Sequence, residues 1–251
     1  KKHLGQHFLT DINIAQKIVG SLSENNRNTI EIGPGMGVLT QFLLPNFPNF
    51  SVSEIDQESV VFLQQKFPTL NIIEGDFLKL NLSKIYSGEL AIIGNFPYNI
   101  SSQILFKVLE NKNQVVEVVG MFQKEVAQRI ASPSGSKDYG ILSVLLQAWY
   151  NITYLFSVSP DVFSPPPNVQ SGVIKLTRKE NFTLDCDEKL FFQVVKTTFN
   201  QRRKTIRNSI KPLSADISRV DEKYLSNRPE QLNVEQFVEI CKSIEMMRKL
   251  I

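Results

Sequence analysis

Four consecutive residues, Asn95-Phe96-Pro97-Tyr98, carry groups that suit a flat base with an exocyclic amine. The Asn95 side-chain oxygen and a nearby backbone carbonyl can accept the two amine hydrogens. Pro97 lacks a backbone N–H and stiffens the chain, and Tyr98 offers a ring face for stacking. The same residues also fit a buried strand over 90–94 that ends in an ordinary turn. Taken alone, the segment leaves both interpretations open.

Gly33 and Gly35 open a glycine-rich turn between an apolar segment and a helical one. Glycines let a ligand approach the backbone closely where a helix begins. Val38 stands where the dinucleotide-binding pattern has its third glycine, which favours a cofactor without a pyrophosphate. Glu54 follows Gly33 by 21 residues (54 − 33 = 21), where a carboxylate can accept hydrogen bonds from ribose hydroxyls. The combination predicts a nucleoside-cofactor site, whereas the turn alone also fits a connection without a ligand.

Asp76 and Phe77 follow a third apolar segment. Asp76 can accept a hydrogen bond from an adenine amine and Phe77 can pack on the ring, although alone they fit an Asp-capped loop equally well. Four segments now end in ligand-type residues, at Gly33, Glu54, Asp76 and Asn95. The carboxyl ends of parallel strands share one edge of a sheet, so we expect these residues to line one site.

A proline-rich loop over residues 163–167 begins with Phe163. Because prolines hold a loop stiff, an aromatic side chain presented there loses little entropy on binding. We expect a flipped base to stack between Tyr98 and Phe163. The alternative is that Phe163 belongs to the core.

The segment 196–211 carries six basic residues and no acidic one. On a single helix, Arg203, Arg207 and Lys211 would recur every four residues and share a face. A merely solvated face normally mixes both signs of charge, so the missing acids favour contact with phosphates. The predicted RNA contacts are Arg202, Arg203, Lys204, Arg207 and Lys211.

The chain has two histidines, His3 and His7, and two cysteines, Cys186 and Cys241. Their number and separation predict no metal site. His7 has no acidic residue beside it, which argues against general base catalysis. The cysteines fit core positions.

Apolar and helical segments alternate up to about residue 178, which predicts an α/β, doubly wound, Rossmann-like sheet. Beyond it the apolar residues keep helical spacing, so we expect a small all-helical C-terminal domain. The predicted domains are 1–180 and 181–251. Predicted strands span 29–32, 50–53, 71–73, 90–94, 115–121, 152–158 and 172–177, and predicted helices 38–44, 59–67, 101–110, 123–131, 139–150, 188–211 and 234–250.

The composition fits a soluble globular protein, since 42% of the 251 residues are hydrophobic and 21% are charged. The net charge of +3 is small, so nucleic-acid binding would depend on local clusters. We find no apolar run near the roughly 20 residues of a membrane helix, and no apolar core of a signal peptide after Lys1 and Lys2. We therefore expect a cytoplasmic protein without membrane contact, and we expect a monomer because no exposed heptad pattern is evident.

Together these motifs resemble the S-adenosylmethionine-dependent ribosomal RNA adenine N6-dimethyltransferase family, and most of all its KsgA-type small-subunit enzymes. The resemblance covers nearly the whole chain. Two residues differ from the usual motifs of that family. His7 stands where the family usually has Asn, and Phe96 stands where it usually has Leu. The segments that carry the resemblance are 2–9, 31–35, 54–56, 75–77, 95–98, 123–127, 136–143 and 163–169.

The resemblance implies S-adenosylmethionine as the cofactor, with residues 2–9 folded over it. It implies a small-subunit rRNA substrate within a pre-ribosomal particle, in which two adjacent adenosines near the 3′ end each receive two methyl groups at N6. A role in small-subunit biogenesis would follow. The target adenine would be held by Asn95, Pro97, Tyr98 and Phe163, and the cofactor by His7, Leu9, Gly33, Gly35, Glu54, Ile55, Asp76, Phe77 and Asn95.

Three other functions remain open. A large-subunit rRNA adenine methyltransferase of the macrolide-resistance type shares the site and the helical domain, although segments 136–143 and 163–169 favour the small-subunit type. A mainly non-catalytic ribosome-assembly factor would not need the intact Asn95 motif. A DNA adenine methyltransferase would call for a separate sequence-reading domain, for which we find no segment.

Overall fold

The computed structural model describes residues 7–23 and 27–248 of the chain and divides it into two compact units. The chain enters the second unit, returns to the first, and ends in the second. The first unit comprises Lys1–Gln128 and Asn151–Arg178, and the second comprises Arg129–Tyr150 and Lys179–Ile251.

This division differs from the predicted domains 1–180 and 181–251, because residues 129–150 group with the C-terminal helices. The reason is aromatic packing. The ring of Trp149 lies 5.9 Å from that of Phe191 and 5.6 Å from that of Phe192, between centroids. The sequence marks a change of character near residue 179 but gives no sign of this earlier crossing.

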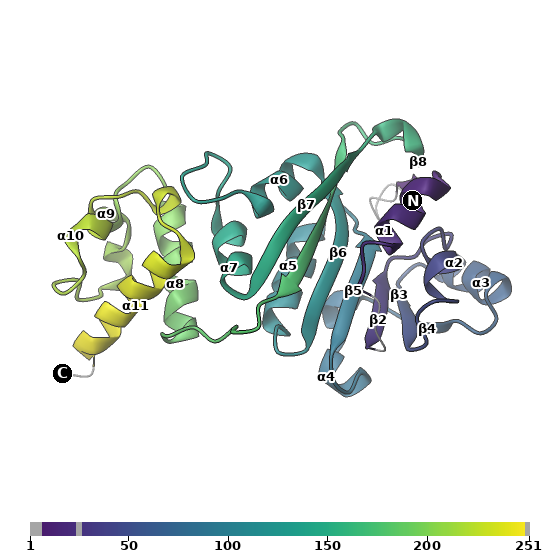
Figure 1. Cartoon of the computed structure of the whole chain (residues 1–251), viewed down its shortest axis with the longest axis horizontal. Helices are drawn as coiled ribbons and strands as arrows, with labels where there is room; N and C mark the ends of the chain where they lie inside the picture. Colours follow the sequence, from purple (N-terminus) through teal and green to yellow (C-terminus); the bar gives the residue numbers. More distant parts are fainter. Residues whose placement is uncertain (1–6, 24–26, 249–251) are drawn as a thin grey trace. The chain divides into compact units, whose positions relative to one another are not determined.

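Seven strands form the sheet of the first unit in the order β4-β3-β2-β5-β6-β9-β7 (Figure 1). Neighbours from β4 to β6 are parallel, and β9 runs antiparallel to β6. Strands β5 and β6 are buried up to their last residues, as central parallel strands must be. The predicted doubly wound sheet is confirmed. The strands are β2 (Asn28–Ile32), β3 (Phe50–Glu54), β4 (Asn71–Glu74), β5 (Leu90–Asn95), β6 (Val115–Gln123), β7 (Tyr150–Val158) and β9 (Ser171–Arg178).

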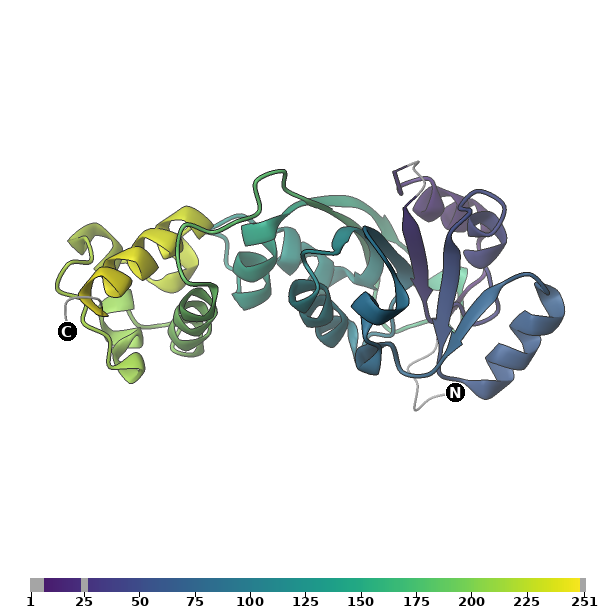
Figure 2. The ribbon, with the colours of Figure 1, turned by 90° about the horizontal axis from the view of Figure 1, so that it is seen from below.

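Helices lie on both faces of this sheet (Figures 1 and 2). On one face, α1 buries Ala15 and Ile18 in a core that includes Val52 and Val119 from the strands. Burial of such side chains stabilises the layer by roughly 1.5–3 kcal/mol each. The helices of this part of the chain are α1 (Ile12–Val19), α2 (Thr40–Leu43), α3 (Gln57–Lys66), α4 (Leu82–Ile85), α5 (Ser101–Glu110) and α6 (Lys124–Ala131).

Short polar and glycine residues fix where these helices begin. The Asp56 carboxylate accepts the Ser59 N–H and caps α3. The helix expected over 38–44 is shorter in the structure, where α2 spans Thr40–Leu43. Gly35 and Gly37 have φ of 54° and 77°, and residues 35–39 form turns before this helix. These left-handed conformations favour glycine.

A separate two-stranded sheet pairs β1 (Phe8–Leu9) antiparallel with β8 (Phe163–Ser164). Leu9 lies opposite Phe163. This pairing brings the start of the described chain beside the proline-rich loop.

A buried carboxylate, Glu117, holds the loop before β2 against the sheet. Its Oε1 lies 2.7 Å from Lys175 Nζ and accepts the Ser23 N–H at 3.0 Å, and its Oε2 lies 3.4 Å from Arg27. The Glu117 side chain is 1% exposed. Removing it would therefore leave two cations without their shared buried partner.

Glu117→Ala is expected to lower the free energy of unfolding by roughly 3–5 kcal/mol, measured by urea denaturation. Glu89→Ala is the matched control, since Glu89 also pairs with an arginine, Arg178, but its side chain is 57% exposed. Its loss is expected to cost at most about 1 kcal/mol. Equal losses for the two variants would contradict the role assigned to Glu117.

The second unit is helical and is built around aromatic side chains. Phe199 lies 6.1 Å from both Tyr139 and Phe237, between ring centroids, and Asp187 caps the helix that carries it. The helices are α7 (Ile141–Trp149), α8 (Glu188–Asn200), α9 (Ile206–Ser209), α10 (Glu222–Leu225) and α11 (Val234–Arg248).

The single helix predicted over 188–211 is wrong. α8 ends at Asn200, residues 201–205 form turns and a bend, and α9 begins at Ile206. The Ile206 N–H donates to the Asn227 carbonyl at 2.7 Å instead of continuing a helical ladder. No glycine or proline marks this break, which depends on that long-range bond. The basic stripe expected on one helix therefore does not form.

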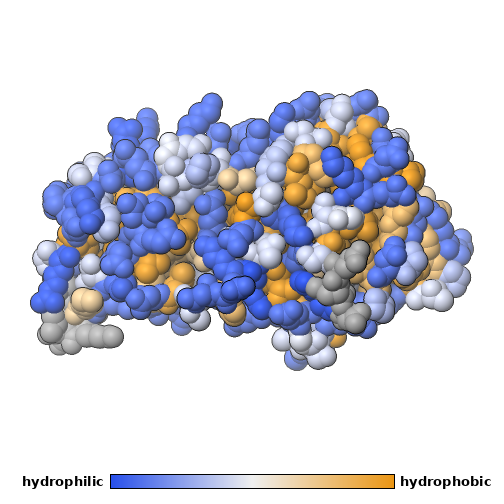
Figure 3. Space-filling model, viewed as in Figure 1, coloured by the Kyte–Doolittle hydropathy of each residue, from blue (hydrophilic) through white to orange (hydrophobic). Residues whose placement is uncertain are grey.

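The surface drawn in Figure 3 mixes hydrophilic and apolar side chains. The large apolar side chains that are exposed, such as Ile12, Ile85 and Met246, come from different elements. No helix within residues 7–23 and 27–248 is long and apolar enough to cross a membrane. The same residues contain no group of three or more His, Cys, Asp or Glu placed to hold a metal ion.

Candidate active site

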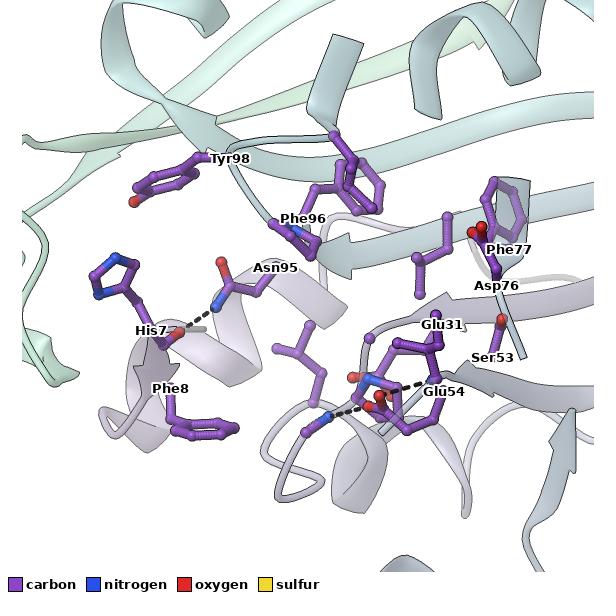
Figure 4. A pocket seen from close by; sticks show the side chains of 18 of the residues that line it. His7, Phe8, Glu31, Ser53, Glu54, Asp76, Phe77, Asn95, Phe96 and Tyr98 are labelled. Carbon is purple, nitrogen blue, oxygen red and sulfur yellow. Dashed lines mark hydrogen bonds between the residues drawn. The ribbon is translucent and has the colours of Figure 1, made fainter. Parts of the chain in front are cut away.

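A cavity of about 310 Å³ opens at the carboxyl edge of the parallel strands. It is lined by the ends of β2, β3, β4 and β5, which supply the four residues expected to share a site: Gly33, Glu54, Asp76 and Asn95. The structure thus brings these residues together. Figure 4 shows Glu54 and Asp76 in one part of the cavity and Asn95 with Tyr98 in another.

Glu54 is held in place by backbone N–H groups. Its Oε2 accepts from Gly35 at 3.2 Å, and its Oε1 accepts from Ile55 at 2.9 Å and Asp56 at 2.8 Å. The residue is 4% exposed, so these bonds keep a buried carboxylate satisfied. A carboxylate has about four acceptor positions, so Glu54 can still receive hydroxyl hydrogens from a ligand.

The glycine turn is shaped by two aromatic rings. A Cβ on Gly35 would lie 2.8 Å from Phe8 Cε1, and a Cβ on Gly37 would lie 2.5 Å from Phe67 Cε2. Both positions need glycine for space as well as for their backbone conformation. Phe8 therefore closes the turn from the side of the N-terminal segment (Figure 4).

Asp76 caps a short helix and also lines the cavity. Its Oδ1 accepts the Leu78 N–H at 3.0 Å and caps a short 3₁₀ helix, Phe77–Lys79. Asp76 also lines the cavity, as do Phe77 and Ser53. A second carboxylate oxygen thus remains for a ligand amine.

Glu31 is a site residue that the sequence analysis missed. It lines the cavity and is 2% exposed. Burial raises its pKa to about 8, although a hydrogen bond from Thr40 Oγ1 opposes this, and the charge of Glu54 raises it further. The sequence places Glu31 two residues before the glycine turn, but nothing in it shows the burial. Gln103, from the first turn of α5, also lines the cavity and was not predicted.

Asn95 has its amide orientation fixed by the N-terminal segment. Its Nδ2 donates to the His7 carbonyl at 2.9 Å (Figure 4). This leaves Oδ1 free of hydrogen bonds to the described residues and facing the space beside Tyr98. The amide is therefore oriented as an acceptor toward the cavity.

Tyr98 is positioned by a hydroxyl pair, because its Oη lies 2.6 Å from Ser171 Oγ. Burial raises the pKa of Tyr98, partly offset by this bond, so the side chain stays neutral. The His7 ring lies 5.7 Å from the Tyr98 ring, between centroids, and His7 Nδ1 lies 2.9 Å from the Pro165 carbonyl oxygen. Pro97 accepts the Ile100 N–H at 3.2 Å, which closes the turn.

Phe163 does not lie where the sequence analysis placed it. It is 4% exposed and belongs to the hydrophobic core with Leu9, and it is absent from the lining of the cavity. Pairing in the β1–β8 sheet turns it inward, so the structure matches the core alternative. Leu9 reaches the cavity wall, and Ile55 also lines it while 59% exposed. Residues 2–6 of the predicted cofactor cover lie outside the described residues.

The predicted RNA contacts divide into two groups in the structure. Arg202 donates to the Lys137 carbonyl at 2.6 Å and lies 3.7 Å from Glu230, and Arg207 pairs with Glu222. Their charges are thus partly neutralised within the chain. Arg203, Lys204 and Lys211 are exposed and pair with no carboxylate among the described residues.

Comparisons with known proteins agree with this geometry. A family model described as "Ribosomal RNA adenine dimethylase" matches residues 1–246. The chain is 58% identical over 244 residues to "Ribosomal RNA small subunit methyltransferase A" of Parabacteroides distasonis, which covers 96% of this chain and 92% of that protein.

Two solved structures share the fold. A dimethyladenosine transferase from Plasmodium falciparum is 24% identical with a TM-score of 0.82, covering 98% of this chain and 99% of that one. The 23S rRNA methyltransferase ErmE is 21% identical with a TM-score of 0.75, covering 95% and 99%. At these identities the likeness concerns the fold alone.

Proposed function

Because the chain belongs to the ribosomal RNA adenine dimethylase family, we propose that it transfers methyl groups from S-adenosylmethionine to N6 of two adjacent adenosines near the 3′ end of small-subunit rRNA. The observation that carries the proposal is one cavity in which a nucleoside-type subsite and the oriented Asn95 amide meet. The first unit is then the methyltransferase domain, and the helical second unit the RNA-binding domain.

The nucleoside-type subsite fits S-adenosylmethionine. Glu54 has acceptor positions for ribose hydroxyls, and Asp76 has one for an adenine amine, with Phe77 beside it. Gly33 has open space where a Cβ would lie, which leaves the backbone accessible to the methionine portion, and Gly35 lines the same cavity beside Phe8. When bound, S-adenosylmethionine supplies an electrophilic methyl group on a positively charged sulfur.

The chain's own contribution to methyl transfer is to position the adenine amine. The lone pair of the adenine N6 is delocalised into the ring. The amine is therefore a poor nucleophile until this nitrogen becomes pyramidal. Asn95 Oδ1 accepts one N6 hydrogen, and the Pro97 carbonyl, which keeps a second lone pair beside its bond to Ile100, accepts the other. Tyr98 stacks on the base. Holding the reacting atoms at contact distance supplies much of the rate.

In this proposal the target base stacks on Tyr98 alone, because Phe163 is buried and does not line the cavity. After transfer the amine carries an extra proton, which it loses readily to water, so no general base is needed. The monomethyl product keeps one N6 hydrogen, which permits the second transfer. We further propose that the chain acts as a cytoplasmic monomer on a pre-ribosomal particle.

The test is transfer of labelled methyl groups from S-adenosylmethionine to under-methylated small ribosomal subunits, with large subunits and duplex DNA in parallel. N6,N6-dimethyladenosine is expected in small-subunit rRNA. Label in large-subunit RNA or in DNA would favour the competing methyltransferases. Cofactor binding without transfer to any substrate would favour the assembly factor.

Arg203, Lys204 and Lys211, which pair with no carboxylate in the described part of the chain, are expected to contact phosphates. Much of the second unit's surface drawn in Figure 3 is hydrophilic. Changing all three to alanine should weaken RNA binding and lower the slope of log K against log salt by about 2–3, since each phosphate contact contributes roughly 0.7–0.9. Binding is measured by filter retention between low and physiological salt.

The matched control removes three other exposed lysines, Lys79, Lys84 and Lys189, and so loses the same charge from other elements. A specific interface predicts a smaller change of slope for the control. Equal slopes would mean that overall charge governs binding, and the assignment of these three residues would be abandoned.

A further inference from the structure

Phe96 is the residue of the Asn95–Tyr98 turn that points into the protein. It is 1% exposed, whereas its neighbours Asn95, Pro97 and Tyr98 are partly exposed around the cavity. Its N–H donates to the Met121 carbonyl at 3.2 Å. The turn is thus anchored to β6 at this residue.

The Phe96 ring lies in a slot between two glycines of neighbouring strands. A Cβ on Gly94 of β5 would lie 2.8 Å from Phe96 Cε1, and a Cβ on Gly120 of β6 would lie 2.4 Å from Phe96 Cε2. These atoms are on opposite edges of the ring. The ring also packs edge-on against Phe122, at 5.1 Å between centroids and 73° between planes.

Neither glycine owes its place to backbone conformation. Gly94 and Gly120 are absent from the glycines with positive φ, and both lie within regular strands. Interior strand glycines weaken a sheet and mark a close approach. Here the Phe96 ring approaches both glycines, together with the Ile32 carbonyl oxygen at Gly94 and the Phe122 ring at Gly120.

We propose that Gly94 and Gly120 form a slot that fixes the Phe96 ring and thereby positions Asn95 and Tyr98 for methyl transfer. Gly120 is then a positioning residue for the reaction. The inference rests on the proposed function. The mechanism is mechanical, because Phe96 is covalently adjacent to Asn95 and two residues from Tyr98. A displacement of about 1 Å at reacting groups can cost roughly a hundredfold in rate.

The two glycines leave room for the ring of Phe96 over β5 and β6. A leucine side chain does not reach across the slot as a planar ring does. The requirement for glycine at position 120 is therefore tied to Phe96, which a Cβ there would approach most closely, and also to Phe122, whose Cε2 would lie 2.7 Å away. We therefore predict that the loss of methyl-transfer activity in Gly120→Ala is relieved when Phe96 is replaced by the shorter leucine.

The experiment compares Gly120→Ala, Phe96→Leu and the double variant in single-turnover methyl transfer to under-methylated small subunits. Gly120→Ala is expected to slow transfer by about 30-fold or more. The Kd for S-adenosylmethionine should stay within about threefold, because most of the expected cofactor contacts, such as Glu54 at the end of β3 and Asp76 after β4, lie outside the displaced turn. The double variant should recover to within about fivefold of Phe96→Leu, with Phe122 shifting into the vacated space.

Gly94→Ala is the matched control. Its Cβ would also lie 2.7 Å from the Ile32 carbonyl oxygen, a backbone atom that Phe96→Leu does not move. Phe96→Leu should therefore not rescue Gly94→Ala. Rescue of both glycine variants alike would point to general loosening of the core and would overturn the proposal.

Three results would count against the slot when the wild type is active: full activity of folded Gly120→Ala, no recovery in the double variant, or failure of the double variant to fold. If the wild type transfers no methyl group, the proposed function fails instead. Crystal structures of the variants then test the role of the slot separately. That role requires Asn95 and Tyr98 to be displaced in Gly120→Ala and to return to their wild-type positions in the double variant.

Discussion

Replacing Asn95 with alanine is expected to slow methyl transfer by about a hundredfold to a thousandfold, the usual effect of losing one oriented polar group at a reacting centre. The variant loses the oxygen that accepts an N6 hydrogen. It also loses the bond from Nδ2 to the His7 carbonyl. The rate is measured by single turnover at saturating S-adenosylmethionine and RNA.

Asn95→Asp separates the two losses. Aspartate keeps acceptor oxygens but cannot donate to the His7 carbonyl, so its rate is expected to lie between those of the wild type and the alanine variant. Asn113→Ala is the control, since Asn113 is exposed in the turn before β6, at the opposite end of the strands. If a higher Kd for the cofactor fully explains the lower rate of Asn95→Ala, the catalytic role of Asn95 is refuted and only a role in cofactor binding is left.

The second large effect concerns Glu31 and pH. Burial raises its pKa to about 8 in the folded protein from the usual 4.5, so the folded state retains a proton that the unfolded chain has released. The stabilisation is fully present below pH 4.5 and is lost as the pH rises through 8. At about 1.36 kcal/mol per pH unit, raising the pH from 5 to 9 should cost on the order of 3–5 kcal/mol.

Glu31→Gln should remove this pH dependence, because glutamine can still accept from Thr40 and has no charge to bury. Urea unfolding of both proteins at pH 5, 7 and 9 measures the difference. Glu110→Gln is the control, since Glu110 is exposed at the end of α5, and it should keep the wild-type slope. Parallel stability curves for wild type and Glu31→Gln would refute the raised pKa.

The carboxyl edge of the sheet could be predicted because its signals are local. Glu54, Asp76 and Asn95 each follow an apolar run, and strand topology alone places such positions together. The burial of Glu31 could not be predicted in this way. Its pKa is raised mainly by that burial, is lowered by the hydrogen bond from Thr40 and is raised further by the charge of Glu54, and all three depend on the folded structure.

The errors have a common physical origin in long-range contacts. Phe163 turns inward because it pairs opposite Leu9, more than 150 residues away in sequence (163 − 9 = 154). The helix break at residues 201–205 depends on Asn227 and on no local breaker. Propensity and spacing carry no information about either partner.

The packing of Trp149 against α8 also limits how related enzymes can be recombined. A chimera that joined residues 1–178 of this chain to the C-terminal segment of a relative would separate α7 from the helix that covers it. The helix from the relative would then have to pack against Trp149 without Phe191 and Phe192, which contact it in this chain. Exchange of the second unit between relatives would therefore require two matched segments, because residues 129–150 have to be transferred together with residues 179–251.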